Sequence, residues 1–309
     1  MASGLSRDVP QAPGRSRGLG RLLEVERHFL VAVSLPALVL MIAVTAIPFA
    51  GTIGLAFTNY DPLHADNWGF VGLSNFADLA SDPNIPTILW TTGYLVILTV
   101  VAETVVGLGL AVLLATPIRG IAIMRTLFLV PVMTASIAVA LVWRALLNPS
   151  QGWVNYVLGV LHLPQPVWLG DPILAIPSVV LSDMWTGVPF MAILFLAGLL
   201  AVPAELKEAA RVDGASAWQV FWRIEVRVIQ PLLFIAILFR TMDTFRKFEG
   251  VKNLTGGGPG LASQVANLEI YNDAFVYNQM GHGAALSVVM TLIITGVLTG
   301  MYLLVRRSR

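Results

Sequence analysis

The chain of 309 residues has no cysteine and little charge. Without a thiol it can form neither a disulfide nor a thiolate-bound metal site, and its cysteine usage leaves the redox compartment undetermined. Only 12% of its residues are Asp, Glu, Lys or Arg, well below the roughly 25% that is typical of soluble domains. Hydrophobic residues make up 56% of the chain. This composition predicts a polytopic membrane protein.

Nucleotide-binding and metal-binding motifs are also missing. The sequence has no G-x-x-x-x-G-K-[ST] motif, and the Gly-rich segment 255–260 lacks the lysine that a phosphate-binding loop needs. If ATP drives this protein, another chain therefore binds it. The four histidines do not have metal-ligand spacing, so we expect no metal site and interpret them as loop or interface residues; they are His28, His64, His162 and His282.

Long apolar stretches dominate the rest of the sequence. About 20 residues of helix suffice to cross a hydrocarbon core of roughly 30 Å, and six stretches are long enough; they are approximately 30–57, 87–115, 126–147, 173–200, 228–248 and 284–305. The first is too long for a cleaved signal peptide and lacks a clear cleavage site. We predict an all-α membrane protein with six transmembrane helices. Residues 1–28 would form a flexible cytoplasmic tail and residues 29–309 the transmembrane domain.

Basic residues are concentrated in alternate connections between these spans. They precede the first span, separate the second from the third and the fourth from the fifth, and end the chain. By contrast, segments 58–86 and 148–172 contain no Lys or Arg. Because loops rich in Lys and Arg stay in the cytoplasm, both termini are predicted to be cytoplasmic. Segment 249–283 is then external, although Lys252 makes it the least clear case.

A polar insert follows the fourth span at residues 203–224. Pro203 is acceptable in the first turn of a helix, and the residues after it place charges on one side and small apolar side chains on the other. Asp213 and Gly214 then end this helix, since Gly allows a left-handed backbone. Asp213 can also cap a second helix, which is expected to start near Ser216. We predict that these two short helices form an exposed cytoplasmic knob, named the knob below; an ordinary amphipathic interfacial helix is the alternative.

The knob resembles the EAA signature of binding-protein-dependent ABC importer permeases. The residues that carry the resemblance are Glu208, Ala209, Ala210, Gly214 six positions after the Glu, and Ile224 sixteen positions after it. Segments elsewhere look like the carbohydrate branch of this family, akin to maltose, trehalose, polyol and glycerol-phosphate permeases. These segments are Asp183-x-Trp185-x-x-x-Pro189-Phe190, Ala197-Gly198-Leu199, Asp213-Gly214-Ala215-Ser216 and residues 254–260.

The resemblance implies a fold like that of type I ABC importer permeases, and a chain that hydrolyses nothing and holds no cofactor. Its partners would be a second homologous permease, giving a heterodimer, and two cytoplasmic ATPase subunits that bind ATP and Mg. An extracellular or periplasmic solute-binding protein would deliver a sugar-like small molecule. Membrane lipid would surround the complex in the bacterial cytoplasmic (inner) membrane, and no nucleic acid would be involved. Contact with the ATPase is expected from Glu208, Ala209, Ala210, Asp213 and Gly214.

One site departs from the family pattern. The signature normally continues from its Ile to a Leu-Pro pair, whereas this chain has Val226 and Arg227 there; Pro231, a second proline usual in the family, is retained. Proline would have fixed the local backbone. The angle at which the knob joins the fifth span is therefore left open. Arg227 also fits a side chain that extends to the cytoplasmic rim.

Ionisable residues inside spans are costly and indicate function. At 1.5 Å per residue, Asp183 lies about 15 Å inside the fourth span and Arg240 about 16 Å inside the fifth, so both are expected near mid-membrane. Trp185 offers a flat face on which a sugar ring can stack. Asp243 lies three residues after Arg240, where an ion pair can form. We predict that Asp183, Trp185, Arg240 and Asp243 bind substrate; simple neutralisation of Arg240 by Asp243 is the alternative.

Three other features bear on this site. Gly187 and Pro189 predict a kink in the fourth span. Around Asp243, the cations Arg240, Arg246 and Lys247 leave positive charge in excess over the one carboxylate, which favours a hydroxyl-rich or anionic ligand over a cation. Glu103, in the second span, has no obvious partner in the sequence and is expected to pair across the bundle.

Two other classes of protein fit the sequence less well. A secondary transporter would also place charges at mid-membrane, but it needs no cytoplasmic knob and usually shows more spans or an internal repeat. A membrane enzyme would need a nucleophile with a base, or a metal cluster, and the sequence shows neither. The ABC permease hypothesis explains the knob, the missing nucleotide motif and the six predicted spans together.

Overall fold

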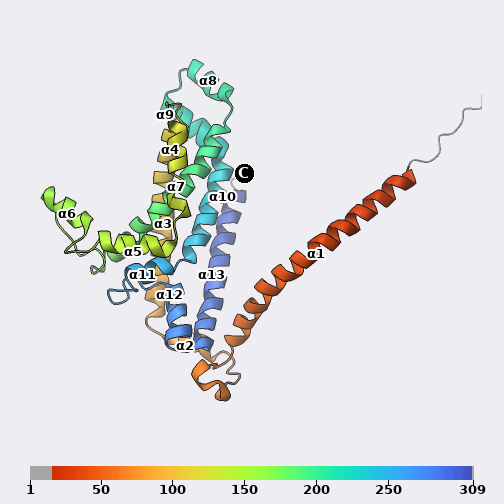
Figure 1. Cartoon of the computed structure of the whole chain (residues 1–309), viewed down its shortest axis with the longest axis vertical. Coiled ribbons are helices and arrows are strands. Elements are labelled where there is room, and N and C mark those ends of the chain that lie inside the picture. Colours follow the sequence, from red (N-terminus) through yellow and green to blue (C-terminus); the bar gives the residue numbers. More distant parts are fainter. Residues whose placement is uncertain (1–15, 308–309) are drawn as a thin grey trace, which may run out of the picture. The chain divides into compact units, whose positions relative to one another are not determined.

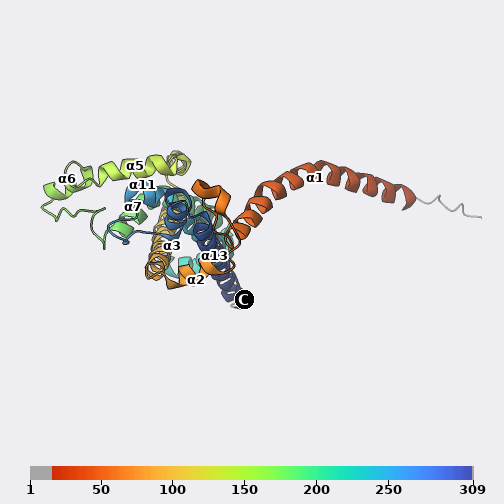
Figure 2. The same cartoon turned by 90° about the horizontal axis from the view of Figure 1, so that it is seen from below.

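The computed structural model describes residues 16–307, and the side chains of residues 33–307 other than Ala65 and Asn67 (Figures 1 and 2). Within this range every regular element is helical, apart from an isolated bridge between Thr58 and Phe70. Residues 1–54 and 55–309 form separate units. Of the predicted tail, residues 16–28 belong to helix α1, and residues 1–15 lie outside the described part.

The first unit consists of helix α1, Ser16–Leu55, which contains Pro36 and Pro48. From Val33 to Leu55 its hydropathy is high enough for a membrane span, and none of its side chains in the tested window is buried. An α-helix that is apolar all round belongs in lipid or against other helices rather than in water.

The second unit is built on four long helices, which run alongside one another (Figure 1): α3 Ile85–Ala115, α7 Ala175–Leu200, α10 Val226–Phe245 and α13 Met280–Arg307. Helices α3 and α7 pack against each other most extensively. Gly107 allows this, because a Cβ atom there would lie only 2.9 Å from the Cβ of Met191. Small residues at such crossings let helix backbones approach closely inside a membrane.

Four helices in the described part are long and apolar enough to span a membrane: α1 from Val33, α3, α7 and α13. Helix α10, expected as the fifth span, is not among them, and its 20 residues include Arg227, Arg240 and Asp243. A bent pair of helices raises the number to five if it counts as one span. The chain is thus a helical multi-pass protein, and the count of six spans remains a prediction.

The bent pair replaces the continuous third span expected at 126–147, so that expectation was wrong. Helix α4, Ile121–Leu127, and the 3-10 turn η2, Pro131–Met133, are followed by α5, Ser136–Leu146, after a bend of 95°. Proline has no backbone N–H to continue a helix. Thr134 and Ala135 then adopt extended backbone angles, which turn the chain.

Short helices fill the connections. They are η1 Pro62–Asn67, α2 Ser74–Ser81, α6 Trp153–Val160, α11 Glu249–Leu254, α12 Ala266–Tyr271 and the π-helical turn η4 Asn272–Val276. In the segment after α1, the side-chain amide of Asn75 donates hydrogen bonds of 2.9 Å to the carbonyls of Ala56 and Thr58. This buried amide fixes α2 to the preceding loop.

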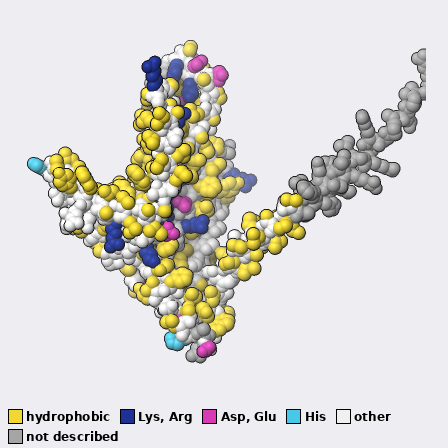
Figure 3. All heavy atoms as spheres, in the orientation of Figure 1, with side chains coloured by type: hydrophobic (Ala, Val, Ile, Leu, Met, Phe, Trp, Pro, Cys, Tyr) yellow, Lys and Arg dark blue, Asp and Glu magenta, His cyan; other side chains and the backbone are white. Residues whose placement is uncertain are grey.

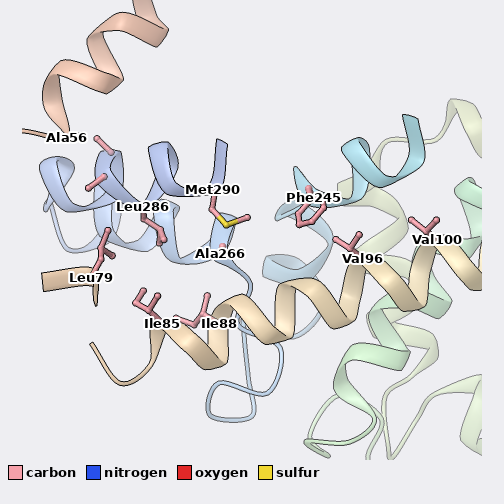
Figure 4. Close-up of a cluster of buried hydrophobic side chains, with 12 residues drawn as sticks. Ala56, Leu79, Ile85, Ile88, Val96, Val100, Phe245, Ala266, Leu286 and Met290 are labelled. Carbon is pink, nitrogen blue, oxygen red and sulfur yellow. The ribbon is translucent and has the colours of Figure 1, made fainter. Parts of the chain in front are cut away.

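A hydrophobic cluster at one end of the bundle joins several helices (Figure 4). Helix α3 contributes Ile85, Ile88, Val96 and Val100, which face Phe245 of α10 and Met290 of α13 and further residues of α2 and α12. The position of α3 beside α10 follows from this packing. Glu103 lies one helical turn beyond Val100, so it is carried toward the same neighbour.

Candidate functional site

Five ionisable side chains meet inside the bundle. Four of them belong to helices α3, α7 and α10, and the fifth follows α10. They are Glu103 on α3, Asp183 on α7, Arg240 and Asp243 on α10, and Lys247 just after α10, and we name them the charge cluster. The side chain of Arg240 is 6% exposed and that of Glu103 is fully buried. Charges so deeply buried persist only when they are paired.

Arg240 is the centre of the charge cluster. Its Nε and Nη2 atoms donate to the two carboxylate oxygens of Glu103, with 2.7 Å between Nη2 and Oε1. Nη2 also donates to Oδ2 of Asp183 at 2.7 Å, and Nη1 donates to Oδ2 of Asp243 at 2.6 Å. The planar guanidinium suits such two-pronged contacts. One side chain therefore connects α3, α7 and α10.

Lys247 completes the network, because its Nζ pairs with Oδ1 of Asp183 and lies 4.0 Å from Oδ2 of Asp243. The predicted pair of Arg240 and Asp243 is confirmed, and Glu103 has its partner across the bundle. The predicted excess of positive charge is wrong, however. Glu103 and Asp183 join from other helices, so the charge cluster has three carboxylates and two cations.

Gly187 provides the space that Glu103 occupies. A Cβ atom built on Gly187 would overlap the Glu103 carboxylate. Pro189 lies inside α7, which nevertheless runs as one α-helix from Ala175 to Leu200. The glycine in this segment is therefore explained by the close approach of Glu103, a contact between α3 and α7 that the sequence spacing alone does not show.

A cavity of about 600 Å³ opens beside the charge cluster, a size within the range of small-ligand sites. It is bordered by residues of η2, α5, α7, α10 and α11. Asp183, Arg240, Asp243 and Lys247 form its charged wall, and Phe190, Phe239 and Phe248 are among its apolar residues. The Asp243 side chain is 58% exposed, so its carboxylate is accessible. Three of the four predicted substrate residues thus line one cavity.

Trp185 does not line this cavity, and its side chain is 52% exposed. Two residues along an α-helix correspond to a rotation of about 200°. Trp185 and Asp183 therefore lie on opposite faces of α7. The structure does not bring Trp185 to the charge cluster, and its role in binding substrate stays a prediction.

The knob consists of α8, Ala204–Val212, and α9, Ala217–Val220, at the end of the bundle farthest from α2 (Figure 1). Helix α8 ends in a Schellman motif: the Ala215 N–H donates to the Ala210 carbonyl at 2.9 Å and the Gly214 N–H to that of Arg211 at 3.1 Å. Gly214 has φ +81°, the left-handed conformation that favours glycine. The tight turn between two short helices is confirmed.

The second helix of the knob begins with a capping box. The Gln219 N–H donates to Oγ of Ser216 at 3.3 Å, and the Ser216 N–H donates to Oε1 of Gln219 at 2.8 Å. Such reciprocal bonds satisfy two backbone donors at a helix start. Asp213 instead ends the first helix. The backbone of the knob is thus fixed by its own hydrogen bonds.

The knob exposes both charge and apolar surface. None of the residues of α8 is buried, and Val212 and Trp218 are 86% and 70% exposed. Lys, Arg, Asp and Glu side chains gather at this end of the bundle (Figure 3). Lys207 pairs with Glu225 at 3.0 Å, which links α8 to the segment that leads into α10. Exposed apolar side chains beside charges are typical of a docking surface for another protein.

A π-helical turn immediately precedes the two positions at which the family signature has its Leu-Pro pair, here Val226 and Arg227. Turn η3, Phe221–Glu225, connects α9 to α10 with no break in helical structure. Arg227 follows it and is exposed. The π-helix occurs mostly as single turns within α-helices, frequently at functional sites. Here the knob joins α10 through a π-turn, with no proline at the junction.

The loop between α11 and α12 is the other glycine-rich region. Gly256, Gly257 and Gly260 all have positive φ, and a Cβ on Gly257 would overlap the side chain of Gln264. The Gln264 amide donates to Glu269. Burial raises the pKa of the Glu269 carboxyl, although this hydrogen bond acts in the opposite direction.

Residues 121–309 match the family model described as the binding-protein-dependent transport system inner membrane component. The trehalose/maltose transport system permease protein MalF of Thermococcus litoralis is 34% identical over 277 residues, which are 89% of this chain and 92% of that protein. The sulfoquinovosyl glycerol transport system permease protein SmoG of Agrobacterium fabrum is 29% identical over 284 residues, 92% of each chain.

Among the solved structures with a similar fold is one that matches along nearly its whole length. It is a bacterial alginate ABC transporter in complex with an alginate pentasaccharide-bound periplasmic protein, with a TM-score of 0.79, 21% identity, and coverage of 92% of this chain and 96% of that chain. This likeness confirms the importer-permease fold. The chain belongs to the family of binding-protein-dependent transport permeases. It is thus a multi-pass membrane subunit of an ABC importer.

Proposed function

We propose that this chain forms half of the pathway by which a sugar or sugar-like solute enters a bacterial cell. The other half would be a second, homologous permease, giving a heterodimer. An external solute-binding protein would deliver the solute, and two cytoplasmic ATPase subunits would bind ATP and Mg and supply the energy. The chain itself would be non-catalytic. The relatives named for trehalose and maltose or sulfoquinovosyl glycerol, and the alginate importer of the same fold, support a carbohydrate solute.

The architecture of the knob is the observation that carries this proposal. A coupling element has to transmit motion, so it must move as one body. The Schellman motif at Gly214, the capping box at Ser216 and the ion pair of Lys207 with Glu225 hold the knob together. Its exposed apolar residues then remain for a partner. We infer that Glu208, Ala209, Ala210, Asp213 and Gly214 contact the ATPase.

The basic residues orient this arrangement in the membrane. Their distribution supports a cytoplasmic position for both termini and the knob in a bacterial inner-membrane protein. The loop that contains Gly256 and Gly257 then faces outside, where a solute-binding protein would dock. The solute would pass the cavity beside the charge cluster and contact Asp183, Arg240 and Asp243. Trp185, on the opposite face of α7, would contact it only elsewhere along the pathway.

Reconstitution of this chain with its three kinds of partner in proteoliposomes tests this function. We expect sugar uptake and solute-stimulated ATP hydrolysis from the parental complex. Glu208→Lys and Gly214→Val should lower both activities at least about tenfold, since a loss of roughly 1.4 kcal/mol in coupling corresponds to tenfold. Solute affinity of the binding protein should not change. The control is Asp66→Lys, a similar charge change at an exposed residue outside the knob. Unchanged uptake in both knob variants would contradict the coupling role.

A further inference from the structure

The cations in the cavity wall are already occupied by carboxylates of the chain. A guanidinium has five N–H donors, and Arg240 makes four contacts with carboxylate oxygens: two with Glu103, one with Asp183 and one with Asp243. Lys247 pairs with Asp183 and lies 4.0 Å from Asp243. An anionic solute would have to compete with these carboxylates for both cations, which keep only one N–H of Arg240 and the remaining protons of Lys247 unused.

The balance of charges around the cavity also disfavours an anionic solute. The charge cluster has one more carboxylate than cations. The other ionisable residues that line the cavity are Arg246 and Glu249. Both are exposed, and neither makes an ion pair within the described residues. Their opposite charges therefore add no net charge to the cavity. The cavity therefore has no excess of positive charge to attract a carboxylate or sulfonate.

The free groups suit hydroxyls. Asp243 keeps an exposed carboxylate oxygen that can accept a hydrogen bond, and one N–H of Arg240 and further protons of Lys247 remain as donors. A hydroxyl both donates and accepts, whereas a carboxylate or sulfonate only accepts. Donors and acceptors side by side thus match a polyhydroxylated, uncharged molecule. The relatives named above handle both neutral and acidic sugars, so family membership leaves the charge of the solute open.

We propose that the cavity admits an uncharged, hydroxyl-rich solute and excludes an anionic one, with Glu103 and Asp183 as the positioning residues that determine this specificity. The proposal rests on the function proposed above. Glu103 and Asp183 hold Arg240 and Lys247 in pairs, and Asp243 offers its free oxygen to solute hydroxyls. Gly187 is part of this arrangement, because only a residue without a Cβ leaves room for the Glu103 carboxylate.

The absence of cysteine makes a direct test possible. A single cysteine is introduced as Thr186→Cys, at a residue that lines the cavity, in the complex assembled with its partners. Its rates of modification by a trimethylammonium and by a sulfonate methanethiosulfonate reagent are compared, and labelling is read on this chain alone. Ser150→Cys, which is exposed outside this cavity, gives the reference ratio of the two rates.

We expect the ratio of cationic to anionic reagent at Thr186→Cys to exceed the reference ratio roughly fivefold, as one net negative charge some 8 Å away in water would produce. Asp243→Asn, at an accessible side chain, should bring it to within about twofold of the reference. Glu103→Gln should raise the sulfonate rate above the parental rate by releasing Arg240, and Asp183→Asn should raise it by releasing Lys247. If the buried Glu103→Gln variant does not assemble, Asp183→Asn tests the same positioning role.

A faster reaction of the sulfonate reagent at Thr186→Cys than at the reference site would overturn the inference. So would a ratio that Asp243→Asn leaves unchanged. These results are separable from the proposed function. Sugar uptake by a complex whose cavity prefers the anionic reagent would support the proposed function and contradict the proposed specificity. A complex without sugar uptake would reject the function whatever the ratio.

Discussion

The knob and the charge cluster are two polar regions of a largely apolar protein, and they are stabilised in opposite ways. The knob is exposed and is fixed by backbone hydrogen bonds and caps between residues close in sequence. The charge cluster is centred on the buried side chains of Arg240 and Glu103 and depends on residues as far as 137 positions apart. We therefore expect the knob to be sensitive to backbone changes, and the charge cluster to the loss of single charged groups.

The largest effect is expected from Glu103→Ala, which leaves the buried Arg240 guanidinium without its two-pronged partner. Removing one member of a buried ion pair costs about 3–5 kcal/mol of the free energy of unfolding. Thermal denaturation of the purified complex, followed by the fraction that stays assembled, measures this loss. Asp243→Ala is the control, because its side chain is more than half exposed and should cost no more than about 1 kcal/mol. Equal losses would refute the central role of Glu103.

Gly187→Ala tests the same region through packing alone. Its methyl group would overlap the Glu103 carboxylate, and such overpacking costs roughly 1–3 kcal/mol of the free energy of unfolding. Gly109→Ala on α3 is the matched control, since a Cβ there meets nothing within 4 Å and should be neutral or slightly stabilising. The same thermal assay applies. If both variants behave alike, the close approach of α3 and α7 at Gly187 is not as described.

Gly214→Ala probes the knob through its backbone. The site has open space but a φ of +81°, and a left-handed conformation costs a residue with a Cβ about 1–2 kcal/mol. Faster hydrogen exchange of the Gly214 and Ala215 amides, with weaker stimulation of ATP hydrolysis, is the expected result. Gly214→Asn should recover part of the loss, because Asn tolerates this conformation. Identical exchange and ATP hydrolysis in the Gly214→Ala variant and the parental protein would show that the Schellman motif is not required.

The smallest effect is expected from Ser216→Ala, which removes the side-chain cap of α9. Loss of such a cap costs about 1 kcal/mol, and it should affect the local opening of the helix more than assembly of the complex. Hydrogen exchange at the Gln219 amide reports the change. Ser216→Asp retains an acceptor, so its Gln219 amide should exchange at nearly the parental rate. Equal exchange rates in the Ser216→Ala and Ser216→Asp variants would contradict the capping box.

The same contrast explains what the sequence could predict. The turn at Gly214, the helix start near Ser216 and the pair of Arg240 with Asp243 all depend on residues within a few positions of one another, so spacing alone predicted them. Glu103 was a different case. A lone carboxylate inside a span requires a cation at similar depth, but its partner lies on another helix, and only the packing of α3 against α10 and α7 identifies it.

One incorrect expectation, and one that stays a prediction, have local causes. Pro131 lies within the predicted third span, and a proline in a helix predicts a break or kink, yet the span was expected to be continuous. Trp185 was grouped with Asp183 by depth, although their spacing places them on opposite faces of a helix. The predicted excess of positive charge was wrong because it counted only residues close in sequence. Glu103 and Asp183 reach Arg240 from other helices.

Contact between the knob and an ATPase subunit is the central claim, and a single cysteine tests it most directly. Ala209→Cys, at an exposed position of α8, is modified with a maleimide photo-crosslinker in membranes that contain the whole complex. The account predicts a crosslink to the ATPase chain from Ala209→Cys and none from Ser150→Cys. Labelling of Ala209→Cys by a membrane-impermeant thiol reagent added outside intact cells, with no crosslink to the ATPase, would contradict it.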